Sequence, residues 1–126
     1  MLIDYVSEDQ TLNLALRFKD PRIRVIADGL NQKLQRRLNQ AIALSQGKYF
    51  ARMDGDDIAY PERLKSQVEY LEAHPEIDLL GTKYLIFDGE GNPMGITQGN
   101  LEHNEICHRP RAGFNILHPT WMGKIE

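Results

Sequence analysis

The sequence predicts an α/β fold in one domain, with helices packed on a largely parallel sheet. Short segments of strand-forming residues alternate with segments whose apolar residues recur at helical spacing, which is typical of βα units. Turn residues such as the Asp28-Gly29 pair separate these segments. At 126 residues the chain has the length of one domain and can bury a substantial core.

The first half of the chain predicts two strands and two helices. Residues 1–3 indicate the end of a strand, and residues 23–26 alternate apolar and charged side chains as a second strand. Between them, residues 7–10 have the pattern of a capping box that starts a helix reaching to about residue 18. A second helix is expected over residues 34–45, and we expect Gly47 to end it in the left-handed conformation.

The middle of the chain predicts a strand, an acidic loop and a helix. Residues 48–53 form a short strand rich in Tyr, Phe and Met, which we expect to be buried. Pro61 stands at the favoured first position of the helix that follows. Its expected inner stripe consists of Leu64, Val68 and Leu71.

The last third of the chain predicts fewer regular elements. Residues 77–80, continued by 82–87, indicate a further strand, and the turn-rich residues 88–93 predict a hairpin. Residues 101–107 are expected to form a short helix. Residues 109–126 show no clear period, so no element is predicted there.

Composition excludes several classes of protein. The formal charge of −3 gives no reason to propose a nucleic-acid binder. The single cysteine, Cys107, permits no intrachain disulfide. No apolar run approaches the roughly 18 residues of a membrane span, and the first ten residues lack the layout of a signal peptide. We therefore expect a cytoplasmic protein.

The most informative segment is the acidic loop, residues 54–57. Asp54, Asp56 and Asp57 repel one another, so water, hydrogen bonds or a cation must offset their charge. The loop follows a strand and precedes a helix, which is the edge where open α/β sheets bind ligands. Hard oxygen ligands in such a loop suit Mg²⁺ or Mn²⁺, with substrate phosphates completing the coordination. The alternative interpretation is a solvated turn that caps the next helix.

Two other motifs share features with the acidic loop. An EF-hand starting at Asp54 would need Gly at its sixth position and Glu at its twelfth, where Ala59 and Lys65 stand, so that motif is excluded. Phosphatases of the haloacid dehalogenase type also carry Asp-x-Asp after a strand, usually with Thr or Val two residues after the second Asp. Ile58 stands there, so this class remains an alternative.

Residues 48–64, KYFARMDGDDIAYPERL, resemble the Asp-x-Asp segment of inverting family 2 glycosyltransferases. Residues 20–26, residues 38–42 and the turn at residues 118–120 also resemble this family, so the resemblance covers nearly the whole chain. It implies a Rossmann-like αβα sandwich of the GT-A type. It also implies transfer of a sugar from a nucleotide-diphosphate donor to a hydroxyl of a sugar, lipid-linked or protein acceptor.

The resemblance assigns roles to residues of this chain. Asp56 is expected to be the main ligand of the Mg²⁺ or Mn²⁺ that bridges the donor diphosphate, and Asp54 is expected to assist near the ribose. The other candidates are the donor-binding residues Asp4 and Arg52 and the active-site residues Asp57 and His118. Arg52 could instead offset the charge of the loop or face solvent, and His118 could instead have a structural role.

For the remaining polar and aromatic residues near the end of the chain, a structural interpretation is mostly favoured over a functional one. Arg109 and Arg111 could bind a phosphate, although a solvated loop is the favoured interpretation. His103, Cys107 and His108 match no common zinc spacing. For Trp121, core packing is favoured over stacking on an acceptor sugar.

The chain departs from the family pattern in three ways. The first nucleotide-binding strand of the family is absent, and the family's acidic base is expected beyond Glu126, so no catalytic base is nominated. Val6 stands at a glycine position of the family, and a β-branched residue resists positive φ. We therefore expect a domain incomplete at both ends and inactive as this fragment, with exposed sheet edges that favour a homodimer. The alternative is a non-catalytic remnant that binds a nucleotide or a protein. The full-length protein is expected to be cytoplasmic or peripheral to the membrane.

Overall fold

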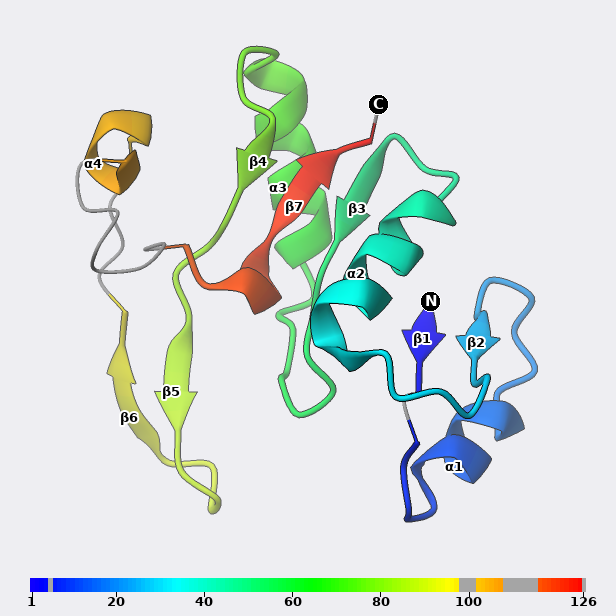
Figure 1. Cartoon of the computed structure of the whole chain (residues 1–126). Helices are drawn as coiled ribbons and strands as arrows, with labels where there is room; N and C mark the ends of the chain where they lie inside the picture. The colour runs from blue at the N-terminus through cyan, green and yellow to red at the C-terminus, as the bar shows by residue number, and fades with distance from the viewer. Residues whose placement is uncertain (5, 98–101, 108–115, 126) are drawn as a thin grey trace. The chain divides into compact units, whose positions relative to one another are not determined.

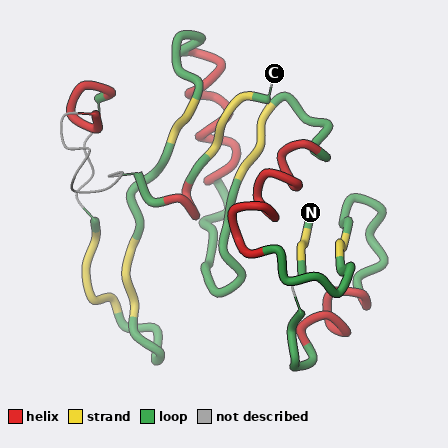
Figure 2. Tube along the Cα trace, in the orientation of Figure 1, coloured by secondary structure: helices red, strands yellow, loops and turns green. Residues whose placement is uncertain are grey.

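The computed structural model describes residues 1–4, 6–97, 102–107 and 116–125 (Figure 1). The chain forms two compact units, residues 1–46 and 47–126, and each is described by itself. Strands and helices alternate in the first unit, and the second unit also contains both, with three strands in succession over residues 79–96 (Figure 2), which agrees with the α/β class.

The first unit contains a parallel pair of short strands. Strand β1 (Leu2–Ile3) pairs with β2 (Val25–Ile26), and helix α1 (Thr11–Arg17) lies between them in the chain. Helix α2 (Lys33–Ala43) follows β2. Because the two strands are parallel, their carboxyl ends lie at the same edge, and Asp4 follows β1 there.

A buried arginine is the centre of the first unit. The Arg37 side chain on α2 is 2% exposed, and within the described part of this unit it is the one fully buried residue. Its guanidinium forms an ion pair with Asp28 and donates to the Leu30 carbonyl at 2.5 Å and to Gln40 Oε1 at 2.8 Å. The hydrogen bonds from Arg37 lower the pKa of Asp28 to about 2. A buried charge needs such pairing to be tolerated.

Two sequence-based expectations about helix ends are wrong. The predicted capping box does not form, because Gln10 is the N-cap and makes no side-chain capping bond. Ser7 instead bonds to Asp4, and Asp9 Oδ1 accepts a hydrogen bond from the Thr11 N–H at 2.8 Å. The C-cap of helix α2 is Leu44, in the right-handed conformation, so Gly47 does not supply a left-handed cap.

The second unit contains a three-stranded sheet covered by helix α3 (Arg63–Ala73). Strand β7 (Met122–Lys124) lies between β3 (Tyr49–Ala51) and β4 (Leu79–Leu80) and runs antiparallel to both (Figure 1). Strands β3 and β4 are therefore parallel to each other, with an antiparallel strand inserted between them. Both strand pairings of this sheet are antiparallel, whereas a largely parallel sheet was expected. The expectation missed β7, because residues 122–124 carry no sequence signal for a strand.

The core of this unit contains a polar residue where an apolar one was expected. Leu71 and Met122 are the large apolar side chains that are buried among the described residues. Leu64 is exposed, contrary to the expected stripe, and Gln67 is buried in its place at 2%. Gln67 is tolerated there because its Nε2 donates to the Thr120 carbonyl at 2.8 Å. Helix α3 also begins at Arg63 rather than at Pro61.

The remaining elements follow the sequence prediction more closely. Strands β5 (Leu85–Phe87) and β6 (Pro93–Ile96) form the predicted antiparallel hairpin, and α4 (His103–Cys107) is the predicted short helix. A 3₁₀ turn, η2 (His118–Thr120), precedes β7. In the described ranges, none of the helices has the length and apolar character needed to cross a membrane.

Candidate functional site

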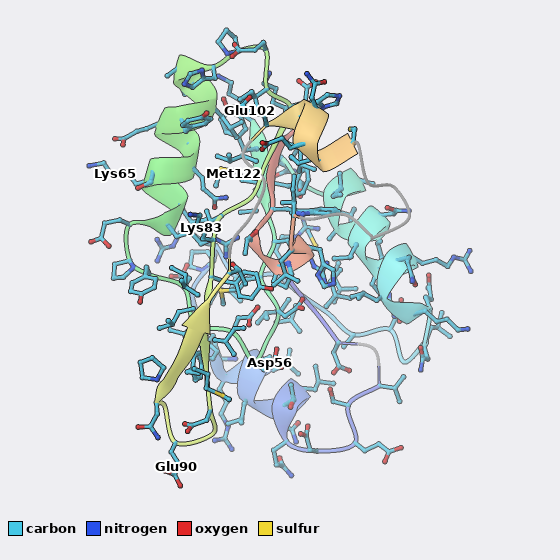
Figure 3. The ribbon with its side chains drawn as sticks, turned by 90° about the vertical axis from the view of Figure 1, so that its left-hand side faces the viewer. Asp56, Lys65, Lys83, Glu90, Glu102 and Met122 are labelled. Atoms are coloured by element: carbon cyan, nitrogen blue, oxygen red, sulfur yellow. The ribbon has the colours of Figure 1, made fainter. Side chains whose placement is uncertain are left out.

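The acidic loop lies where the sequence predicts it. Residues 54–57 connect the carboxyl end of β3 to α3, and Figure 3 labels Asp56 on this loop. The Asp57 N–H donates to the Asp54 carbonyl at 3.3 Å, which makes the loop a tight turn. Asp56 and Asp57 are exposed to solvent, whereas Asp54 is half-buried.

Arg52 holds Asp54 in one orientation. Arg52 Nη2 lies 2.8 Å from Asp54 Oδ1, and the Arg52 side chain is only 9% exposed. The interpretation of Arg52 as a solvent-facing strand residue is therefore wrong. The observed pair matches the interpretation that Arg52 offsets the charge of the loop, because an ion pair removed from bulk water is screened less.

The turn at His118 meets the acidic loop. His118 Nδ1 lies 3.9 Å from Asp54 Oδ2, too far for a hydrogen bond but within reach for charge attraction when the imidazole is protonated. The rings of His118 and Trp121 meet edge to face with centroids 6.4 Å apart. Asp54 is thus bounded by Arg52 on one oxygen and by His118 near the other.

The carboxylates fit an open cation site rather than a closed one. Over the described ranges, no three His, Cys, Asp or Glu side chains converge as a metal centre. Mg²⁺ is commonly held by one or two carboxylates together with waters and substrate phosphates, so a site of this kind does not require three converging side chains. Asp56 is exposed and has no hydrogen bond or ion pair to another described residue.

Asp4 belongs to the first unit and is held by its own loop. Its carboxylate accepts hydrogen bonds from the Val6 N–H at 3.1 Å, the Ser7 N–H at 3.3 Å and the Ser7 hydroxyl. The Ser7 hydroxyl is the main reason that the pKa of Asp4 is lowered. These bonds orient the carboxylate and use most of its acceptor positions.

Val6 adopts the backbone conformation that a glycine would take. Its φ is +75°, in the region that β-branched residues avoid. The sequence raised doubt that this loop could keep its shape with valine at the glycine position. The structure keeps the positive φ and places the strain on Val6.

Two polar residues of α3 were missed by sequence reasoning. Arg63 Nη2 donates to the Arg52 carbonyl at 2.6 Å and to the Pro119 carbonyl at 3.0 Å, and its Nε donates to Gln67 Oε1 at 3.1 Å. The Pro-Glu-Arg-Leu segment that contains Arg63 is part of the family resemblance, but it indicates no role for this side chain. Nothing in the local sequence indicates that Gln67 is buried.

The other candidates gain no functional support. Trp121 is half-buried and its Nε1 donates to the Ile116 carbonyl at 3.0 Å, as a packed tryptophan does. His103 Nε2 lies 3.6 Å from Cys107 Sγ on α4, and no third metal-ligating side chain joins them within the described residues. His108, Arg109 and Arg111 lie outside the described residues.

The chain is similar to known glycosyltransferases over nearly its whole length. The sequence model of the family described as "Glycosyl transferase family 2" matches residues 1–122. "Putative glycosyltransferase EpsE" of Bacillus subtilis is 38% identical over 94 residues, which cover 72% of this chain and 34% of that protein. An uncharacterized glycosyltransferase of Haemophilus influenzae is 36% identical over 111 residues, covering 82% of this chain and 34% of the relative. The amylovoran biosynthesis glycosyltransferase AmsE of Erwinia amylovora is 41% identical over 76 residues, covering 60% of this chain and 28% of the relative.

The matched part is about a third or less of the length of these relatives. The match of the family over residues 1–122 includes both the strand that precedes Asp4 and the acidic loop. It sets aside the phosphatase alternative for the Asp-x-Asp segment. The chain belongs to glycosyl transferase family 2.

Proposed function

We propose that this chain carries the donor-binding part of an enzyme that transfers a sugar from a nucleotide-diphosphate donor to an acceptor hydroxyl. The observation that supports this proposal is the acidic loop at the carboxyl end of β3, with Asp54 oriented by Arg52 and faced by His118. Family membership supports sugar transfer in general. The acceptor, whether a sugar, a lipid-linked sugar or a protein, belongs to the same proposal.

The acidic loop is proposed to hold Mg²⁺ or Mn²⁺. Such an ion stabilises, as a Lewis acid, the negative charge that develops on the departing diphosphate. Asp56 would be the main ligand, because it is exposed and has no hydrogen bond or ion pair to another described residue. Asp54 would contribute Oδ2, since Oδ1 is bonded to Arg52. Asp57, which carries the third carboxylate of the loop, would have a supporting role.

The remaining candidates are proposed to bind and orient the donor. The Asp4 carboxylate, fixed by Ser7 and Val6, would accept a hydrogen bond from the nucleotide. His118 could donate to a phosphate oxygen from its position 3.9 Å from Asp54. None of the described residues is assigned as the catalytic base.

Self-association through sheet edges remains a prediction of the sequence analysis. Within the described strands, β3 and β4 each have one neighbour, and β1 and β2 pair only with each other. Strands with one unpaired edge can pair with another chain. Light scattering across a dilution series would measure this association, and a monomer at high concentration would contradict it.

Metal binding by the acidic loop can be tested directly. Mn²⁺ is titrated into the chain with and without uridine diphosphate, and binding is measured by paramagnetic relaxation. Asp56→Asn should weaken Mn²⁺ binding about tenfold or more, because a neutral amide replaces the charged ligand. Glu90→Gln, which removes an exposed carboxylate on the hairpin turn (Figure 3), should bind as the wild type does. Equal binding by Asp56→Asn and the wild type would refute the assignment.

A further inference from the structure

Arg63 connects the two segments that meet at Asp54. The Nη2 atom of Arg63 donates to two carbonyls. One is that of Arg52, which precedes the acidic loop, and the other is that of Pro119, within the η2 turn. These carbonyls belong to residues far apart in the sequence, and both lie next to candidate site residues. Pro119 follows His118 directly, and Arg52 is two residues before Asp54.

Gln67 completes the connection from the same face of α3. Residues four apart on a helix are neighbours, and Gln67 Oε1 accepts from Arg63 Nε at 3.1 Å. Gln67 Nε2 donates in turn to the Thr120 carbonyl at 2.8 Å. Two consecutive carbonyls of the turn, those of Pro119 and Thr120, are therefore held by α3.

The position of Arg63 is unfavourable for a helix taken alone. Arg63 is the first residue of α3, where a positively charged side chain is repelled by the positive end of the helix dipole. Burial also lowers the pKa of Arg63. Local preferences that are violated in this way are expected where a residue serves a site.

We propose that Arg63 is a positioning residue that sets the distance between the acidic loop and the His118 turn. The proposal rests on the proposed function of these two segments. A single planar guanidinium reaches both carbonyls, which a flexible Lys ammonium reaches less well. Without Arg63, the turn would keep the bond from Gln67 and the bond from the Arg52 N–H to the Trp121 carbonyl at 2.9 Å. It would lose the bridge that joins the Pro119 carbonyl, next to His118, to the Arg52 carbonyl.

The test compares Arg63→Gln, Arg63→Lys and the control Lys65→Gln. Lys65 lies on the same helix, projects outward (Figure 3) and has a side chain that is 75% exposed. The first readout is acrylamide quenching of Trp121, the only tryptophan of the chain, whose ring contacts His118. The second is Mn²⁺ affinity in the presence of uridine diphosphate, and far-UV circular dichroism confirms that each variant is folded.

Arg63→Gln should increase quenching of Trp121 and weaken Mn²⁺ binding about tenfold, as loss of groups that support metal ligands commonly does. Arg63→Lys should recover part of both losses, and Lys65→Gln should match the wild type. A variant that loses only thermal stability, with wild-type quenching and affinity, would overturn the proposal. If Arg63→Gln does not fold, Arg63→Lys decides in the same way.

The two proposals fail differently. If the wild type binds no Mn²⁺ with uridine diphosphate, the proposed function is wrong. The quenching of Trp121 then decides alone whether Arg63 orders the turn.

Discussion

The sharpest prediction about stability concerns Gly123, which lies in the three-stranded sheet of the second unit. It lies in β7 opposite Phe50 of β3. A Cβ added at Gly123 would lie 2.6 Å and 2.9 Å from two ring carbons of Phe50, and 3.2 Å from the Asp78 carbonyl oxygen. Carbon atoms in favourable contact are about 3.5–4.0 Å apart, so the ring would have to move.

Gly123→Ala should therefore lower the free energy of unfolding by about 2 kcal/mol, within the range found for overpacked cores. Urea unfolding followed by Trp121 fluorescence measures this, because Trp121 directly precedes β7. Gly95→Ala in β6 is the control, since a Cβ added there would meet no atom within 4 Å and the φ of Gly95 is not positive. It should change the free energy of unfolding by less than about 0.5 kcal/mol.

A second substitution separates the clash from other effects. In a Phe50→Leu background, the smaller side chain leaves room for the Cβ, so Gly123→Ala should cost at least about 1 kcal/mol less than it does beside Phe50. The reasoning is refuted if Gly123→Ala is as stable as the wild type. It is also refuted if the cost is the same in the Phe50→Leu background, since the contact with the Phe50 ring would then be irrelevant.

Two further predictions concern the first unit. Val6→Gly should raise the free energy of unfolding by up to about 1 kcal/mol. The reason is that relief of a backbone strain of about 1–3 kcal/mol exceeds the extra conformational entropy that glycine loses on folding. A loss of thermal stability would contradict this. The pKa of Asp28 is lowered to about 2 from its ordinary 3.8, so its contribution to stability is present above about pH 4 and is lost as the pH falls toward 2. Asp28→Asn should flatten this acid limb in unfolding followed by circular dichroism, and an unchanged pH profile would count against the Asp28–Arg37 pair.

The order of strands and helices could be predicted because it depends on local patterns. The helix over residues 33–43, the hairpin at residues 85–96 and the acidic loop after β3 all follow from periodicity and turn residues. Strand β7 could not be predicted in this way. Residues 122–124 form a strand because β3 and β4 bond to them from both sides, not because their own sequence favours one.

The side chains behind the site could not be predicted for a related reason. Helical spacing places Leu64 and Gln67 on neighbouring positions of α3, and tertiary contacts decide which of them is buried. Gln67 is buried because the Thr120 carbonyl needs a donor there. In the sequence, Arg63 stands out only as part of a segment that resembles the family. Its role could not be predicted, because the fold brings its two carbonyl partners together.

The acidic loop itself shows how its charge is tolerated. The sequence contains no basic residue within residues 54–57, and the structure supplies the basic groups from the flanking elements. Arg52 neutralises one oxygen of Asp54. Burial lowers the pKa of Arg63, and the negative charge of Asp57 acts against this shift. Arg52 directly follows β3 and Arg63 begins α3, whereas Asp56 at the tip of the loop keeps its carboxylate exposed and without an ion pair to another described residue. The carboxylate with the least compensation gains most from a bound cation, which is the physical reason to propose Asp56, rather than Asp54, as the main ligand of the proposed cation.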